Sequence, residues 1–224
     1  MARTIVPIGG GRSCEGLVGF LAGLTAKERP RVLYIGTASA EDPTFALVTY
    51  DRFAGFADVS RLEFFPWPPE DLRSTVLDQD LIFVGGGNTA NMLAIWRLHG
   101  VDKLLAEAAD GGIVLAGSSA GGICWFEHGV TDSFGPQLAP MECLGFLAGS
   151  FCPHWDDEEN RRPVYHELLE GGFPPGYAAD AGVGLQFVDG ELREAVACDE
   201  GSRAYRLELR DGEVVETPIP ARPL

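Results

Sequence analysis

The sequence has few lysines and no long apolar run, and each shortage excludes a class of protein. Only two of its 17 cationic residues are lysines, and 33 acidic residues give a formal net charge of −16. That charge has the wrong sign for attraction to nucleic acid or to an anionic membrane surface. No stretch approaches the roughly 20 apolar residues that a membrane-spanning helix needs. We therefore expect no nucleic-acid partner and no membrane partner, and homodimer formation is left open.

Cysteine pairs with a recognisable spacing are also missing. The five cysteines are odd in number, include no CxxC pair and lie in apolar surroundings; they are Cys14, Cys124, Cys143, Cys152 and Cys198. This usage is typical of reduced, buried thiols in a cytosolic protein. The stretch MARTIVPIGGG has no long apolar segment followed by a cleavage site. The sequence therefore predicts a soluble protein in the cytoplasm.

What is present is an alternation of apolar runs and helical stretches over the first two thirds of the chain. The runs TIVPI, RVLYIG, LIFV and GIVLAG precede helices expected near 14–26, 43–55, 90–98 and 120–127. This order predicts an α/β fold with a mostly parallel central sheet and helices on both faces. After about residue 177, Asp189-Gly190 and Asp211-Gly212 indicate antiparallel C-terminal hairpins, expected at an edge of the same sheet. We expect residues 1–224 to form a single domain.

The pentapeptide GSSAG contains the strongest candidate for a nucleophile. It fits the pattern G-x-S-x-G with Ser119 at its centre, after an expected strand and before an expected helix. A serine on such a cramped turn needs nearly side-chain-free neighbours two residues away, and Gly117 and Gly121 occupy both positions. A purely structural turn is the alternative, and Ser118 is the weaker candidate because it lies off the apex.

A serine nucleophile needs a base, and the chain offers four histidines. His154 follows an apolar run and a proline, which predicts a loop at a strand end, where catalytic side chains are often presented. The others have simpler explanations: His99 ends a helix, His128 is expected to close the helix that begins at the serine, and His166 has the spacing of a helix surface. We therefore expect His154 to be the general base for Ser119.

Two further stretches resemble binding motifs. The acidic run HWDDEE is interpreted as a solvated helix start with Asp156 or Asp157 as N-cap, because no second histidine has the spacing of a metal site. The run FVGGGNTANML lacks the GK[ST] of a nucleotide-binding loop, but its amides could stabilise an oxyanion. We expect no metal and no organic cofactor.

Taken together, FVGGGNTANML, AGSSAGGICWFEHGVTDS and CPHWDDEENRRP resemble the aspartyl dipeptidase (peptidase E) family of serine peptidases. Relatives of that family include cyanophycinase, and its fold is similar to the three-layer sandwich of class I glutamine amidotransferases. The resemblance implies that Ser119 is the nucleophile and His154 the general base. It also implies an oxyanion hole made by the backbone amides of Gly87 and Ala120, with Asn88 in contact with substrate.

The third member of a catalytic triad is where this sequence departs from the family. The family's acidic residue lies in a stretch of the form acid-Gly-small, and by ungapped comparison its position falls on Ala181. Alanine cannot orient an imidazole. The alternatives are Asp180, which would point to the opposite face if the segment is extended, then Asp132, then an incomplete triad.

The resemblance also implies a substrate class. The family cleaves small peptides with an N-terminal aspartate, whose side-chain carboxylate is held by an arginine; here Arg161 or Arg162 matches, and both could equally be surface residues. We therefore expect a serine exopeptidase acting on small peptides through an acyl-enzyme. The alternatives are a related hydrolase of other peptides or esters, and a binding or regulatory protein with an impaired triad; an amidotransferase role is weaker because the apex residue is not cysteine.

Overall fold

The structure is a computed structural model that describes residues 1–11 and 14–224. The first half of the chain forms a parallel sheet in the order β3-β2-β4-β5-β1. Four of these strands coincide with the apolar runs: β1 (Thr4–Ile8), β2 (Arg31–Ile35), β4 (Leu81–Val84) and β5 (Val114–Ser118). The edge strand β3 (Asp58–Leu62) was not expected, because polar residues interrupt its short sequence.

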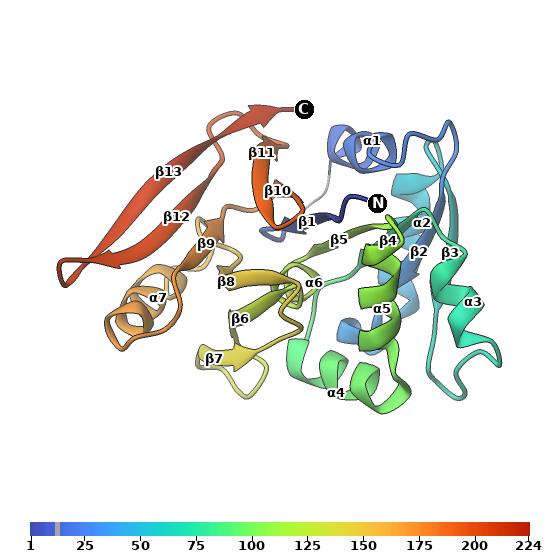
Figure 1. Ribbon diagram of the computed structural model, residues 1–224, viewed down its shortest axis with the longest axis horizontal. Coiled ribbons are helices and arrows are strands. Elements are labelled where there is room, and N and C mark those ends of the chain that lie inside the picture. Colours follow the sequence, from blue (N-terminus) through green and yellow to red (C-terminus); the bar gives the residue numbers. More distant parts are fainter. Residues whose placement is uncertain (12–13) are drawn as a thin grey trace.

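Helices cover both faces of this sheet, as the sequence predicts (Figure 1). Successive residues of a strand point to opposite faces, and here they enter two separate clusters of buried residues. Ile5 belongs to the cluster that contains residues of α3, α4 and α5, whereas Val6 belongs to the cluster that contains residues of α1 and α2. These helices are α1 (Glu15–Gly23), α2 (Pro43–Phe53), α3 (Leu72–Leu77), α4 (Thr89–His99) and α5 (Val101–Asp110), with a 3₁₀ turn η1 (Thr37–Ser39) before α2.

The helix expected near 120–127 is wrong in its length. The helix α6 spans only Ala120–Ile123, and the chain then enters strand β6 (Phe126–Thr131). Glycine is a poor helix former, and α6 contains two glycines, whereas Phe126 and Val130 of the strand are fully buried. His128 consequently lies on β6, where its ring packs edge-on against Phe173, and does not close a helix.

The C-terminal hairpins are confirmed, but they do not lie at the edge of the sheet. Over the described residues the thirteen strands follow the order β3-β2-β4-β5-β1-β10-β11-β13-β12-β9-β8-β6-β7. The hairpins therefore join the parallel part to a second group of strands. The remaining strands are β7 (Ala139–Glu142), β8 (Leu147–Cys152), β9 (Gly176–Ala179), β10 (Val183–Val188), β11 (Glu191–Ala197), β12 (Arg203–Arg210) and β13 (Glu213–Pro223).

The helix α7 (Arg161–Glu170) packs against β12 and β13. Its N-cap is Asn160, so neither Asp156 nor Asp157 caps it; both lie in the turn that precedes the helix. No helix in the described part of the chain is long and apolar enough to cross a membrane.

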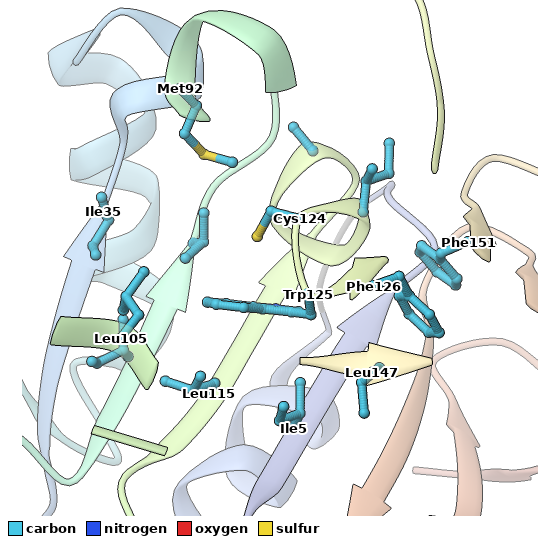
Figure 2. Packing of buried hydrophobic residues seen from close by; sticks show 14 of the residues in the cluster. Ile5, Ile35, Met92, Leu105, Leu115, Cys124, Trp125, Phe126, Leu147 and Phe151 are labelled. Atoms are coloured by element: carbon cyan, nitrogen blue, oxygen red, sulfur yellow. The ribbon is translucent and has the colours of Figure 1, made fainter. Parts of the chain in front are cut away.

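Aromatic packing fixes the position of α6 within the fold. The rings of Phe126 and Phe151 are stacked with their centroids 5.2 Å apart (Figure 2). The ring centroids of Trp125 and of Trp96 in α4 are 6.5 Å apart. Ala120 and Ile123 of α6 belong to the same cluster of buried residues. The turn that holds Ser119 is therefore anchored through α6 in a large, closely packed core.

One cysteine expectation is wrong. Cys14 and Cys198 form a disulfide, with their Cα atoms 5.6 Å apart and a sequence separation of 184. The spacing of two cysteines so far apart in sequence gives no sign of this pairing, which the fold creates by placing α1 beside the end of β11. The other three thiols are free, and two of them, Cys124 and Cys152, are buried.

Candidate active site

Ser119 lies on a strained turn between β5 and α6. Its backbone has φ 56° and ψ −113°, a combination that a non-glycine residue rarely adopts. The amide of Ser119 donates to the carbonyl of Ile8 in β1 at 3.0 Å, and its carbonyl accepts from Gly122 and Ile123 at 2.8 Å each. These three bonds hold the backbone in the strained conformation and present the side chain at the end of the strand.

The glycines on either side of the serine are required by close backbone contacts. A Cβ on Gly117 would lie 2.3 Å from the carbonyl oxygen of Gly121, and a Cβ on Gly121 would lie 2.3 Å from that of Val84. Both distances are far below any normal contact. The turn therefore has no room for a side chain at either glycine, which is the property that makes the G-x-S-x-G pattern indicate a nucleophile.

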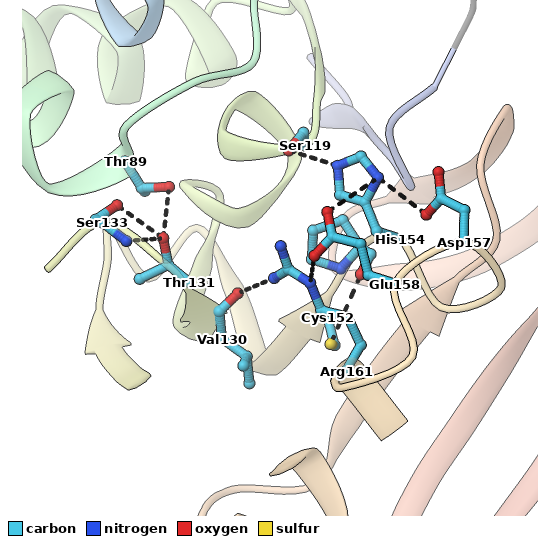
Figure 3. Close-up of polar contacts among 11 residues, drawn as sticks. Thr89, Ser119, Val130, Thr131, Ser133, Cys152, His154, Asp157, Glu158 and Arg161 are labelled. Carbon is cyan, nitrogen blue, oxygen red and sulfur yellow. Dashed lines mark hydrogen bonds and ion pairs between the residues drawn. The ribbon is translucent and has the colours of Figure 1, made fainter. Parts of the chain in front are cut away.

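His154 reaches Ser119 from the loop after β8. Its Nε2 lies 2.9 Å from Oγ of Ser119, within hydrogen-bonding distance (Figure 3). The backbone amide of His154 donates to Gly9 at 2.7 Å, and its ring packs on Gly10, where a Cβ would lie 2.3 Å from the imidazole. Gly9 and Gly10, which follow β1, thus fix the position of the ring. The structure brings together the two residues that the sequence analysis named.

The carboxylates that approach the other imidazole nitrogen come from the turn just after the histidine. Nδ1 of His154 lies 3.2 Å from Asp157 and 3.8 Å from Glu158 (Figure 3). Both residues were expected to belong to a solvated acidic segment. The signal that could have identified them is their spacing of three and four residues from the histidine, because one turn of chain brings such residues together.

The structure places Asp180 and Asp132 elsewhere. The Asp180 carboxylate accepts from the backbone amide of Arg203 at 2.9 Å, so it supports the β12 end of the sheet. Burial raises the pKa of Asp180, partly opposed by that hydrogen bond. Asp132 is exposed in the turn after β6. Neither carboxylate is among the described groups that contact the imidazole.

The two amides expected to form the oxyanion hole lie beside the serine, Gly87 on the glycine loop (Gly85–Gly87) between β4 and α4, and Ala120 at the first position of α6. Gly87 has φ 134°, and a Cβ there would lie 2.1 Å from the carbonyl oxygen of Ala38, so only glycine fits. A Cβ on the preceding Gly86 would lie 3.3 Å from Cβ of Ser119. Among the described residues, neither the Gly87 amide nor the Ala120 amide has a hydrogen-bond acceptor within the protein. Donors of this kind can bind a developing oxyanion.

Asn88 was expected to contact substrate, but its side chain is engaged within the protein. Its Oδ1 accepts from the amide of Asn91 at 2.8 Å and caps α4, and its Nδ2 donates to the carbonyl of Ser133 at 2.9 Å. Asn88 therefore holds the glycine loop on the helix, a role that N-cap propensity could have predicted.

The two arginines expected to bind a substrate carboxylate are engaged as well. Arg161 is buried, and its guanidinium donates to Glu158 at 2.7 Å and to the carbonyl of Val130 at 2.9 Å. Arg162 lies over the rings of Trp155 and Tyr205 and forms an ion pair with Glu216. Neither arginine lines the pocket that contains Ser119 and His154.

That pocket has a volume of about 680 Å³ and holds an arginine that the sequence analysis missed. Its walls come from the glycine loop, from β2 and β4, and from α2, which contributes Thr44, Phe45, Val48, Thr49 and Arg52. A pocket of this size can hold a small peptide. Arg52 has no local motif to distinguish it from the other arginines of the chain, so only the fold reveals it.

The buried cysteines do not compete with Ser119 as nucleophiles. Burial raises the pKa of Cys152 to about 12, and it raises the pKa of Cys124 well above its ordinary value. Both thiols therefore stay protonated near neutral pH, and a protonated thiol is a poor nucleophile.

Comparisons with known proteins identify the family of the chain. The model of Peptidase family S51 matches residues 7–195. A relative from Bacillus subtilis (strain 168), named Uncharacterized peptidase YgaJ, is 43% identical over 228 residues and covers 99% of each chain.

Two solved structures have the same fold. A peptidase from an acI-B1 Actinobacterium superposes with a TM-score of 0.74 at 18% identity, over 99% of this chain and 95% of that one. A putative peptidase E protein from Listeria monocytogenes EGD-e gives 0.68 at 17% identity, over 89% of this chain and 100% of the other. The family match and the close relative together show that this chain belongs to peptidase family S51.

Proposed function

We propose that this peptidase hydrolyses short peptides with an N-terminal aspartate through an acyl-enzyme on Ser119. The observation that carries the proposal is the 2.9 Å contact between Nε2 of His154 and Oγ of Ser119, on a turn whose strain and glycines serve to present that hydroxyl. His154 takes the hydroxyl proton as the serine attacks the peptide carbonyl, and returns it to the leaving amine. The amides of Gly87 and Ala120 stabilise the oxyanion of the tetrahedral intermediate.

Asp157 is the residue that we assign to the imidazole Nδ1. Its carboxylate lies 3.2 Å from Nδ1, and its negative charge favours a proton on that nitrogen, which leaves Nε2 free to accept the serine proton. Glu158, at 3.8 Å from the same nitrogen, adds negative charge that stabilises the imidazolium. The substrate class is supported by the resemblance of three motifs to aspartyl dipeptidases and by a pocket large enough for a dipeptide.

Substitution of the nucleophile is the first test. We expect Ser119→Ala to lower kcat for Asp-Leu by at least about 10⁴-fold, because removal of a triad serine eliminates the covalent route. The measurement is dipeptide hydrolysis by purified recombinant protein, with circular dichroism to show that the variant folds. Unchanged turnover by Ser119→Ala would exclude this mechanism, and turnover of Leu-Leu with none of Asp-Leu would exclude the aspartyl substrate class.

Substitution of the carboxylate tests the third residue. We expect Asp157→Asn to lower kcat by about 10- to 100-fold, less than the roughly 10⁴-fold loss for a buried triad acid, because Asp157 is half exposed and Glu158 is close. Asp180→Asn is the matched control and should keep kcat within about 2-fold, since its carboxylate bonds the backbone of Arg203. The reverse order of effects would transfer the role to Asp180.

A further inference from the structure

One wall of the pocket beside Ser119 is a single face of α2. The residues that line it, Thr44, Phe45, Val48, Thr49 and Arg52, follow the spacing of one helix face. Phe45 and Val48 are exposed, and Phe83 of β4 lines the same pocket. The wall is therefore apolar over most of its length, and Arg52 supplies a positive charge at its C-terminal end.

Arg52 is available to a ligand in a way that the two arginines named from the sequence are not. Among the described residues that line this pocket it is the one lysine or arginine, and it makes no hydrogen bond or ion pair with any described residue. By contrast, ion pairs already occupy Arg161 and Arg162. An unpaired guanidinium in a chain with a formal net charge of −16 is well suited to a carboxylate that comes from a ligand.

The position of Arg52 indicates which substrate carboxylate it meets. Arg52 shares a surface depression with Glu15, the first residue of α1. The loop that leads to α1 contains Gly10, which packs on the imidazole of His154, and Gly11, which lines the pocket. Arg52 lines the pocket together with Gly11 and His154, and we place it on the His154 side of Ser119. His154 protonates the leaving amine, so the leaving residue lies on that side.

We propose that Arg52 binds the C-terminal carboxylate of the leaving residue, while Phe45, Val48 and Phe83 contact an apolar side chain of that residue. This inference rests on the proposed function and deepens it. It makes the substrate a free dipeptide with an apolar second residue, because a longer peptide has no carboxylate at that point. Arg52 is a binding residue in this scheme and takes no part in proton transfer.

The test is a binding measurement that does not need turnover. The affinities of Ser119→Ala and of Ser119→Ala/Arg52→Gln are measured by calorimetry for Asp-Leu and for its C-terminal amide, Asp-Leu-NH₂. We expect Arg52→Gln to weaken Asp-Leu binding by about 10- to 100-fold, as loss of a charge-assisted pair does, and to leave the amide nearly unaffected. Arg52→Lys should recover part of the affinity, and substitution of the exposed Arg193 of β11, Arg193→Gln, should change the affinity for neither ligand.

Each other outcome overturns the proposal. An equal loss for Asp-Leu and its amide would show that Arg52 acts without the C-terminal carboxylate. If Arg52→Gln removed the preference for Asp-Leu over Asn-Leu, the arginine would bind the aspartyl side chain instead. No binding of Asp-Leu to Ser119→Ala would also overturn it. Steady-state kinetics on the protein with Ser119 intact separates the two proposals, because normal binding without any hydrolysis contradicts the proposed function alone.

Discussion

At the scale of single residues, the backbone of Ser119 is held in a conformation that costs roughly 1–3 kcal/mol and is stabilised by bonds to β1 and α6. The sequence predicts this position because the chemistry leaves a local mark, two glycines at fixed distances. His154 is predictable from its place after an apolar run. Asp157 is marked in the sequence only by its spacing from His154, which its acidic neighbours nearly share, and Arg52 differs from the other arginines only in what the fold brings near it.

Asp180 provides a prediction on stability and pH. Burial raises its pKa in the folded protein, so the folded state binds the proton more tightly than the unfolded state does. The stability that this gives is present below the ordinary carboxyl pKa and is lost as pH rises through the raised pKa. Asp180→Asn keeps an oxygen to accept from Arg203 but carries no charge. We therefore expect this variant to unfold at a higher denaturant concentration than the parent at pH 7.

The check is a series of denaturant titrations of both proteins between about pH 3 and pH 7, a range that brackets carboxyl titration. The difference in unfolding free energy should shrink as pH falls and vanish near the low end. A difference that stays constant over this range would mean that the charge of Asp180 is not its cause.

At the scale of elements, the parallel strands and their covering helices follow from local pattern, whereas β6 does not. The stretch after Ser119 was predicted as one helix, and the structure ends that helix after a single turn. In β6, Phe126 and Val130 are buried against other strands, and such burial depends on partners distant in sequence. The start of helix α7 also depends on a partner distant in sequence, because the guanidinium of Arg161 donates to the carbonyl of Val130 in β6.

This contact between α7 and β6 predicts a loss of stability on substitution. We expect Arg161→Met to lower the free energy of unfolding by about 1–3 kcal/mol, because the buried carbonyl of Val130 loses a charged donor. Arg162→Met is the matched control; its side chain is half exposed, and the loss should stay below about 1 kcal/mol. Equal losses in urea titrations of the two variants would contradict a special role for Arg161.

At the scale of the whole molecule, two groups of strands are joined through hairpins that the sequence predicts correctly but places wrongly. The turns at Asp189-Gly190 and Asp211-Gly212 have positive φ at each residue, as their sequences indicate. Strand β13, however, pairs with β12 on one side and with β11 on the other, and the second pairing is parallel. Local pattern reveals neighbours in sequence and not such long-range partners, which also explains the unexpected bond between Cys14 and Cys198.

The disulfide predicts a stability that depends on reductant. Because it closes a long loop, we expect its loss to lower the free energy of unfolding by about 2–4 kcal/mol. The measurement is thermal unfolding with and without dithiothreitol, and Cys14→Ser/Cys198→Ser should show no response to the reductant. Titration of five reactive thiols in the denatured, unreduced protein would contradict the pairing.

The same bond turns residues 14–198 into a covalent ring that contains Ser119 and His154. A protease that cuts once inside the ring, for example beside the exposed Trp67, would open the loop without releasing a fragment. The nicked chain would migrate as one species on an electrophoresis gel until a reductant is added, and then as two. The parts of the active site on either side of the cut would remain covalently linked, so a single cut in a surface loop would not separate them.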